Sequence, residues 1–261
     1  MHLLWFHHAG GHGDSYRAMA AILPAHWAVS LIEYPGRGLR AHLPPHDNLA
    51  QLANGLLPEV LQRVQDVGSP FAFFGHSMGA LVAYEVALRL HASDKPCPDW
   101  LGVSGHRAPE LTRPREEWLH PLPDGELLLR LRQLGALPAH AVSPHYLTLM
   151  RADLRACETR VVHPLSPECG LPCALSTFTG DVDPMVSTSA IHPWSHRVRG
   201  PVRHHVLPGG HFFLAGMQRR RVIELIVQDI AHARHRPLNS SPSLTNHASR
   251  TSSSHHARLG H

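Results

Sequence analysis

The sequence predicts a domain of the α/β class, with a mostly parallel sheet and helices on both faces. Short apolar segments suited to buried strands alternate with helix-length segments along most of the chain. The 261 residues are 43% apolar, which is enough to form one sizeable core. No internal repeat interrupts this order, so a single folded domain over residues 1–236 is expected.

The first third of the chain supplies two predicted strands and one long predicted helix. Residues 3–7 and 28–33 are short apolar runs that end in the Gly-rich loop "HHAGGHG" and the turn "YPGRG". Beyond them, apolar residues recur at intervals of three and four from Leu49 onward, which is typical of an amphipathic helix. Asp47 is the expected N-cap of this helix. Pro58 falls inside it and is expected to kink it.

The remaining strands and helices follow the same alternation. Residues 71–74, 101–104, 174–179 and 202–207 are predicted strands, and residues 78–90 and 212–234 are predicted helices. The last 25 residues, 237–261, are rich in Ser and His and almost free of core residues. Such a composition cannot bury enough apolar surface to offset ordering, so this tail is expected to be disordered.

Residues 108–168 break the alternation. They contain two helical segments, "DGELLLRLRQLG" and "PHYLTLMRADLRACETRVV", with no strand between them. A helical insertion between two strands of a parallel sheet is a candidate lid over a site at the sheet edge. The alternative interpretation is an additional packing layer that does not move, and the pattern alone does not separate the two.

Composition excludes several classes of function. The formal charge is +4, but the arginines are scattered or gathered in the run at 219–221, without the aromatic interleaving of a nucleic-acid footprint. No apolar run reaches the roughly 18 residues that span a bilayer, and the N-terminus has the pattern of a strand, not a signal peptide. The four cysteines form no metal or disulfide pattern, and the 25 histidines include no H-E-x-x-H. A cytoplasmic protein without a metal is expected.

The segment "FFGHSMG" indicates the chemistry. It carries an apolar strand directly into G-x-S-x-G, with Ser77 between Gly75 and Gly79. A sharp strand-to-helix turn lifts a serine hydroxyl clear of the backbone, and glycine two positions before and after relieves the crowding that the turn causes. The pattern therefore predicts a nucleophile elbow with Ser77 at its tip. The amide of Met78 would begin the following helix, where it is free to bind an oxyanion.

The other members of a catalytic triad are expected in the order acid, then histidine. The strand at 174–179 runs into "GDVDP", where Asp183 is preferred as the acid and Asp181 as a turn or capping residue. His211 follows the last strand and a Gly-Gly turn in "PGGHFF", which is the expected place of the general base. His76, next to the serine, is interpreted as a structural neighbour.

These residues together predict acyl transfer to water through an acyl-enzyme. His211 would deprotonate Ser77, and Asp183 would hold the imidazole in the required tautomer. The second oxyanion amide is expected in the loop after the first strand, from Ala9 or Gly10.

Six motifs in one order resemble a known family. They are "FHHAGG", "EYPGRGLR", "PFAFFGHSMGALVAYEVALRL", "VSGHRAP", "GDVDP" and "PGGHFFL". Together they resemble the type II, or editing, thioesterases of polyketide and non-ribosomal peptide synthesis, over roughly residues 3–234. The resemblance implies an α/β-hydrolase fold with a helical lid at 108–168. It maps the nucleophile, acid and base to Ser77, Asp183 and His211, and the oxyanion amides to Met78 and Ala9.

The resemblance also implies a substrate and a partner. Such enzymes remove stalled or aberrant acyl groups from the 4′-phosphopantetheine arm of acyl or peptidyl carrier proteins, with no cofactor. Carrier proteins are generally acidic, so Arg37, Arg40, Arg107 and Arg113 are candidates for the docking side. A monomer is the default. A general carboxylester hydrolase shares the triad and is the alternative enzyme, and a hydrolase-fold protein that only binds a carrier or ligand is the non-enzymatic alternative.

Overall fold

The computed structural model describes all residues except 69, 138–141, 163–169 and 236–261. The predicted tail, parts of the predicted insertion and Cys169 therefore lie outside the described residues. Six strands form one sheet: β1 (His2–Phe6), β2 (Ala28–Ile32), β3 (Phe71–His76), β4 (Trp100–Ser104), β5 (Ala174–Gly180) and β6 (Val202–Leu207). Six α-helices accompany them within the described residues: α1 (Arg17–Ala20), α2 (Leu49–Val67), α3 (Met78–Ala92), α4 (Asp124–Gln133), α5 (Pro144–Glu158) and α6 (Arg219–His235).

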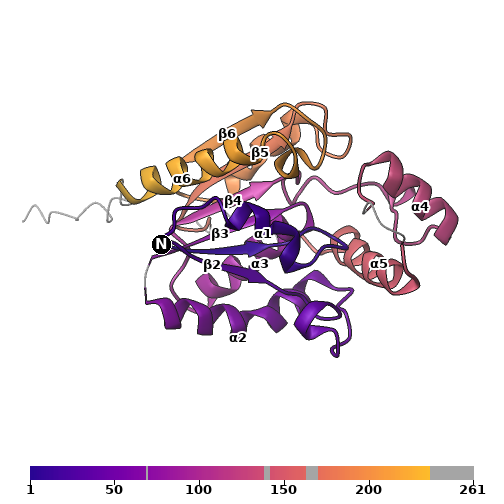
Figure 1. Ribbon diagram of the computed structural model, residues 1–261, viewed down its shortest axis with the longest axis horizontal. Helices are drawn as coiled ribbons and strands as arrows, with labels where there is room; N and C mark the ends of the chain where they lie inside the picture. The colour runs from indigo at the N-terminus through magenta and orange to yellow at the C-terminus, as the bar shows by residue number, and fades with distance from the viewer. Residues whose placement is uncertain (69, 138–141, 163–169, 236–261) are drawn as a thin grey trace, which may run out of the picture.

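The sheet is parallel throughout. Its strand order is β2-β1-β3-β4-β5-β6, and every neighbouring pair is parallel. Figure 1 shows α2 and α3 on one face of the sheet and α6 on the other, with α4 and α5 beyond one end. The predicted α/β class is confirmed, and each strand begins and ends within two residues of its expected bounds.

The two cores follow from the alternation of side chains along the strands. In β1, Leu4 and Phe6 join the core beneath α2 and α3, whereas Leu3 and Trp5 join the core beneath α1 and α6. All four side chains are almost completely buried. Because both faces of the strand are covered, β1 is a continuous apolar run with no polar alternation, as parallel strands usually are.

Two expected helix boundaries are wrong. Helix α2 is capped by Asn48, whose side chain accepts from the Gln51 amide at 3.0 Å, and not by Asp47. Asp47 forms an ion pair with Arg155 of α5 instead. The last helix begins at Arg219, because the chain first makes a separate 3₁₀ turn over Phe213–Ala215. Apolar residues recur in both the 3₁₀ turn and the helix, so the sequence pattern does not indicate the boundary between them.

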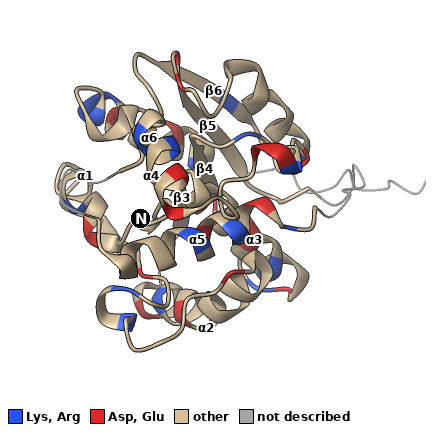
Figure 2. Cartoon of the chain, turned by 90° about the vertical axis from the view of Figure 1, so that its right-hand side faces the viewer, with Lys and Arg blue, Asp and Glu red and all other residues tan. Residues whose placement is uncertain are grey.

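Charges of both signs are interspersed on the face that presents α4 and α5 (Figure 2). None of the described helices is long and apolar enough to cross a bilayer. Within the described ranges, no three His, Cys, Asp or Glu side chains are grouped as metal ligands would be.

Candidate active site

Ser77 lies at the junction of β3 and α3, in a backbone conformation that few residues adopt. Its φ is 55° and its ψ is −121°. The flanking glycines have the contacts that the elbow requires. A Cβ on Gly75 would lie 2.0 Å from the carbonyl oxygen of Gly79, and a Cβ on Gly79 would lie 2.1 Å from that of Phe6 in β1. No side chain fits at either place, so the turn depends on both glycines.

His211 and Asp183 complete a hydrogen-bonded line to Ser77. The Ser77 Oγ lies 3.0 Å from His211 Nε2, and His211 Nδ1 lies 2.8 Å from Asp183 Oδ2. The carboxylate only accepts, so Nδ1 carries the proton and Nε2 accepts the hydrogen bond from the serine hydroxyl. The side chains of His211 and Asp183 are 2% and 0% exposed. The structure thus brings together three residues that stand up to 134 positions apart.

The two aspartates of "GDVDP" have different surroundings. The second oxygen of Asp183, Oδ1, accepts from the Met185 amide at 2.8 Å, which fixes the carboxylate toward His211. Asp181 accepts from the Gly209 amide at 2.8 Å and braces the turn before His211. Asp181 makes no contact with the imidazole in the described hydrogen-bond network. The geometry agrees with the preference for Asp183 and with a turn role for Asp181.

The two residues predicted to supply oxyanion amides line the same pocket as Ser77. Met78 is the first residue of α3, and Ala9 lies in the loop after β1; both line the pocket that contains Ser77. The Gly10 amide donates to Asp153 Oδ2 at 2.8 Å and is therefore engaged elsewhere. Of the two alternatives for the second oxyanion amide, Ala9 is the one whose N–H is not already used by a described residue.

Three further histidines surround His211, and burial keeps each of them neutral. Burial, with a smaller contribution from His211, lowers the pKa of His8 to about 3. Burial likewise lowers the pKa values of His76 and His106 well below 6.5. His76 Nδ1 lies 2.9 Å from Ser104 Oγ, and His8 Nδ1 lies 2.7 Å from the Tyr16 hydroxyl. His76 is therefore a structural neighbour, as expected, and none of the three contacts Ser77 Oγ among the described hydrogen bonds.

An ion pair that the sequence did not predict holds the loop after β1. Arg37, in the "PGRG" turn, donates to both carboxylate oxygens of Asp153 on α5, at 2.7 and 2.9 Å. The same carboxylate holds the Gly10 amide, and Arg37 also donates to the Gly11 carbonyl. Both side chains are at least 95% buried. Arg37 therefore cannot dock a carrier protein, and that expectation is wrong; the available signal was an aspartate among the apolar positions Leu149, Met150 and Leu154.

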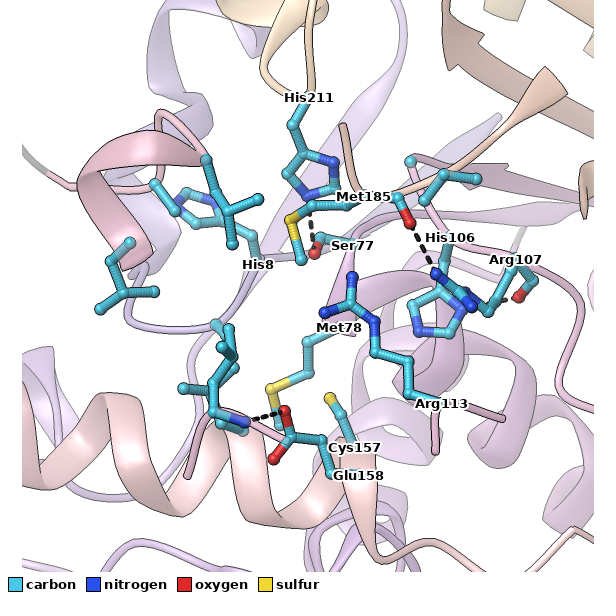
Figure 3. A pocket seen from close by; sticks show the side chains of 18 of the residues that line it. His8, Ser77, Met78, His106, Arg107, Arg113, Cys157, Glu158, Met185 and His211 are labelled. Carbon is cyan, nitrogen blue, oxygen red and sulfur yellow. Dashed lines mark hydrogen bonds between the residues drawn. The ribbon is translucent and has the colours of Figure 1, made fainter. Parts of the chain in front are cut away.

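The pocket that opens from Ser77 is mostly apolar. It encloses about 830 Å³ when its mouth is included. One part is lined by α4, α5 and the loop before them, through Leu119, Leu131, Leu134, Met150 and Leu154. The arginines Arg107, Arg113 and Arg160 also line the pocket. Figure 3 shows Arg107 and Arg113 together with Ser77. The space suits an acyl chain of small or moderate size beside a nucleophile.

The chain is similar to proteins of one family. The model of the thioesterase domain family matches residues 1–230. The solved structure of the RedJ thioesterase from the prodiginine pathway of Streptomyces coelicolor is 36% identical, with a TM-score of 0.80 over 88% of this chain and 90% of that one. The type II thioesterase BorB from the borrelidin cluster is 34% identical, with a TM-score of 0.76 over 88% and 91%.

A curated relative has a different kind of name. Linear gramicidin dehydrogenase LgrE of Brevibacillus parabrevis is 34% identical over 87% of each chain. Its name describes an oxidoreductase, whereas the family model and the two solved structures are named for thioesterases.

Proposed function

We propose, from the premise that this chain belongs to the thioesterase domain family and hydrolyses thioester bonds, that its substrates are acyl groups on the 4′-phosphopantetheine arm of carrier proteins. In this proposal it acts as a type II thioesterase beside a polyketide or non-ribosomal peptide synthase, as BorB is named to do in its own cluster. The single observation that carries the chemistry is the line from Ser77 Oγ through His211 to Asp183.

The reaction begins with attack by Ser77. As its Oγ approaches the thioester carbonyl, His211 Nε2 removes the hydroxyl proton, and Asp183 stabilises the imidazolium that forms. The amides of Met78 and Ala9 are proposed to hold the developing oxyanion, which supplies a large share of the rate enhancement. The arm then leaves as a thiol, after His211 returns the proton. Water then attacks the acyl-enzyme. His211 removes a proton from the water and returns it to Ser77 Oγ as the acid product leaves.

A thioester suits this apparatus because sulfur donates little electron density to its carbonyl and a thiolate leaves readily. The apolar walls of the pocket add selectivity for acyl substrates, because an acyl chain that binds against them moves its apolar surface out of water. The segment at 108–168 includes α4 and α5, which form these walls, and we propose that it acts as the lid of the acyl pocket. These features favour a thioester hydrolase with a defined acyl site.

The test is hydrolysis of one acyl group, propionyl, on three carriers. The three substrates are propionyl on a phosphopantetheinylated carrier protein, propionyl-coenzyme A and p-nitrophenyl propionate. Each is assayed with the parent protein and with Ser77→Ala. We expect the highest kcat/KM with the carrier protein and loss of turnover by at least about 1000-fold in Ser77→Ala.

Equal turnover of the ester and no preference for the carrier protein would favour the general carboxylester hydrolase. Turnover that survives Ser77→Ala, with the variant folded as judged by circular dichroism, would remove the serine mechanism altogether.

A further inference from the structure

The pocket beside Ser77 contains more positive than negative charge. Arg107, Arg113 and Arg160 line it, and Glu158 is the acidic residue among its described lining residues. Burial lowers the pKa of Arg107, and the positive charge of Arg113 lowers it further. The guanidinium groups therefore lie close enough to repel one another in a pocket whose walls are otherwise mostly apolar.

Glu158 does not neutralise these arginines. Its two oxygens accept from the amides of Leu119 and His120, at 2.8 and 3.1 Å, and the second also lies 2.7 Å from His120 Nδ1. The carboxylate is thus committed to the start of the segment that leads to α4. Among the described lining residues, three arginines therefore stand against one carboxylate.

The three arginines differ in what they do for the fold. Arg107 donates to the Met185 carbonyl at 2.8 Å, and Arg160 donates to the carbonyls of Cys157 and Pro109. These two guanidinium groups hold loops together. Arg113 forms neither a hydrogen bond nor an ion pair through its side chain with any residue in the described part of the chain.

The Arg113 side chain points into the pocket. Figure 3 shows its guanidinium extending from the wall toward the side where Ser77 and Met185 lie. A planar guanidinium with free N–H groups binds a carboxylate through two parallel hydrogen bonds, and does so more strongly when water is partly excluded. An arginine with no side-chain partner in the described part of the chain, in the same pocket as a nucleophile and a second arginine, has the properties of a binding group for an anion.

We propose that this thioesterase accepts acyl groups that end in a carboxylate, such as a malonyl group, and that Arg113 binds that carboxylate. The inference rests on the proposed function, since it assigns the substrate class of the same site. The acyl end is the part of the substrate concerned, because the arm next to the sulfur contains neutral amides and its phosphate lies at the far end. Hydrolysis is otherwise unchanged: Ser77 takes the acyl group, the thiol leaves with a proton, and water releases the free diacid.

The test compares two acyl groups of equal size. Malonyl and acetoacetyl contain the same number of heavy atoms, but only malonyl ends in a negative charge. Both are presented as N-acetylcysteamine thioesters, because this carrier is uncharged and leaves the acyl group as the variable, and the released thiol is measured. The parent protein is compared with Arg113→Met, which keeps an unbranched apolar stem but removes the charge, and with Arg113→Lys, which keeps the charge.

Arg115→Met is the matched control. Arg115 lies two positions away on the same loop, with its guanidinium over the Trp118 ring, and does not line the pocket. We expect Arg113→Met to lower the malonyl-to-acetoacetyl ratio of kcat/KM by about 10- to 100-fold. Arg113→Lys should restore part of the ratio, and Arg115→Met should leave it within about 2-fold of the parent.

An unchanged ratio in Arg113→Met, or an equal fall in Arg115→Met, overturns this inference while leaving the proposed function intact. A parent protein that hydrolyses acetoacetyl but rejects malonyl overturns it as well. A parent protein that hydrolyses no thioester on any carrier overturns the proposed function and this inference together.

Discussion

Asp183 and Asp181 show how much of the site depends on single residues. They stand two positions apart in one loop, yet one holds the His211 imidazole and the other holds the Gly209 amide. The difference lies in direction, because the strand β5 ends at Gly180 and the following turn points the two carboxylates apart. A Cβ on Gly180 would lie 2.1 Å from the Gly209 carbonyl, so the two loops meet at backbone contact.

This arrangement separates two substitutions of the same chemical kind. We expect Asp183→Asn to lower kcat by about 100- to 10 000-fold, because the amide no longer selects the tautomer that leaves Nε2 able to accept a proton. Asp181→Asn should change kcat by less than about 5-fold, since an amide oxygen still accepts from Gly209. Steady-state hydrolysis of a propionyl thioester measures both values of kcat. A larger loss in Asp181→Asn than in Asp183→Asn would mean that Asp181, and not Asp183, is the acid of the triad.

At this scale the sequence predicted the residues that a motif identifies and missed those that only packing identifies. Ser77, Asp183 and His211 follow strand ends in a fixed order, so a single sequence is enough to propose them as a triad, and they lie within hydrogen-bond distance of one another in the structure. Asp153 stands in no such motif, and Arg113 was expected on the docking side and not among the residues that line the pocket. Their roles depend on which segment packs against which, and a carboxylate on a helix has no local signal for the amide 143 positions earlier that it binds.

Among the elements, α5 has a role beyond lining the pocket. Its Asp153 joins the "PGRG" turn to the loop that contains Ala9, through one buried carboxylate with three donors. The helix is therefore connected to the proposed oxyanion site. A shift of α5 would move the Gly10 amide, and with it the amide of the preceding residue.

We expect Asp153→Asn to reduce both stability and kcat. Loss of the carboxylate charge leaves the Arg37 guanidinium buried without its counter-ion, which costs about 3–5 kcal/mol in the free energy of unfolding. Urea unfolding measures this loss, and propionyl thioester hydrolysis measures kcat.

The double variant Arg37→Met, Asp153→Leu separates the two effects. It removes both charges and should recover most of the stability, because apolar replacements of a buried ion pair are often tolerated. It should not recover kcat, since leucine at position 153 offers the Gly10 amide no acceptor. A double variant with parental kcat would show that the ion pair serves stability alone.

The boundaries of the elements show where sequence patterns stop being informative. Both Asp47 and Asn48 are good N-caps; the structure uses Asn48 as the cap, and Asp47 pairs with Arg155 on another helix. The start of α6 was misplaced for a related reason. Apolar residues at 212–215 pack as a 3₁₀ turn beside His211, and apolar periodicity does not distinguish such a turn from the first turn of a helix.

For the molecule as a whole, the buried histidines predict how stability depends on pH. His7, His8, His76 and His106 follow or end β1, β3 and β4, at the same edge of the sheet. Burial is the largest cause of the lowered pKa in every case. Between pH 6.5 and those lowered values, the unfolded chain binds protons that the folded chain does not, so stability falls as the pH falls.

We therefore expect the free energy of unfolding to decrease by about 1.4 kcal/mol per histidine between roughly pH 7.5 and 5.5. Asp229 adds a further loss only at lower pH. Although burial opposes it, hydrogen bonds from His205 and Ser176 and the nearby positive charges lower its pKa below 3.8. Urea unfolding at constant ionic strength checks this dependence, and equal stability at the two pH values would mean that these imidazoles accept protons without unfolding.

The contact between Asp153 and Arg37 also has a consequence for anyone who recombines this enzyme with its relatives. The segment between β4 and β5 looks like a cassette that could be exchanged to alter the acyl group accepted. Asp153 belongs to that cassette, but its partner Arg37 lies between β2 and α2, far outside it. A chimera that exchanges only the cassette would therefore keep Arg37 but could lose its partner at position 153. Position 37 and the segment that lines the pocket must be exchanged together.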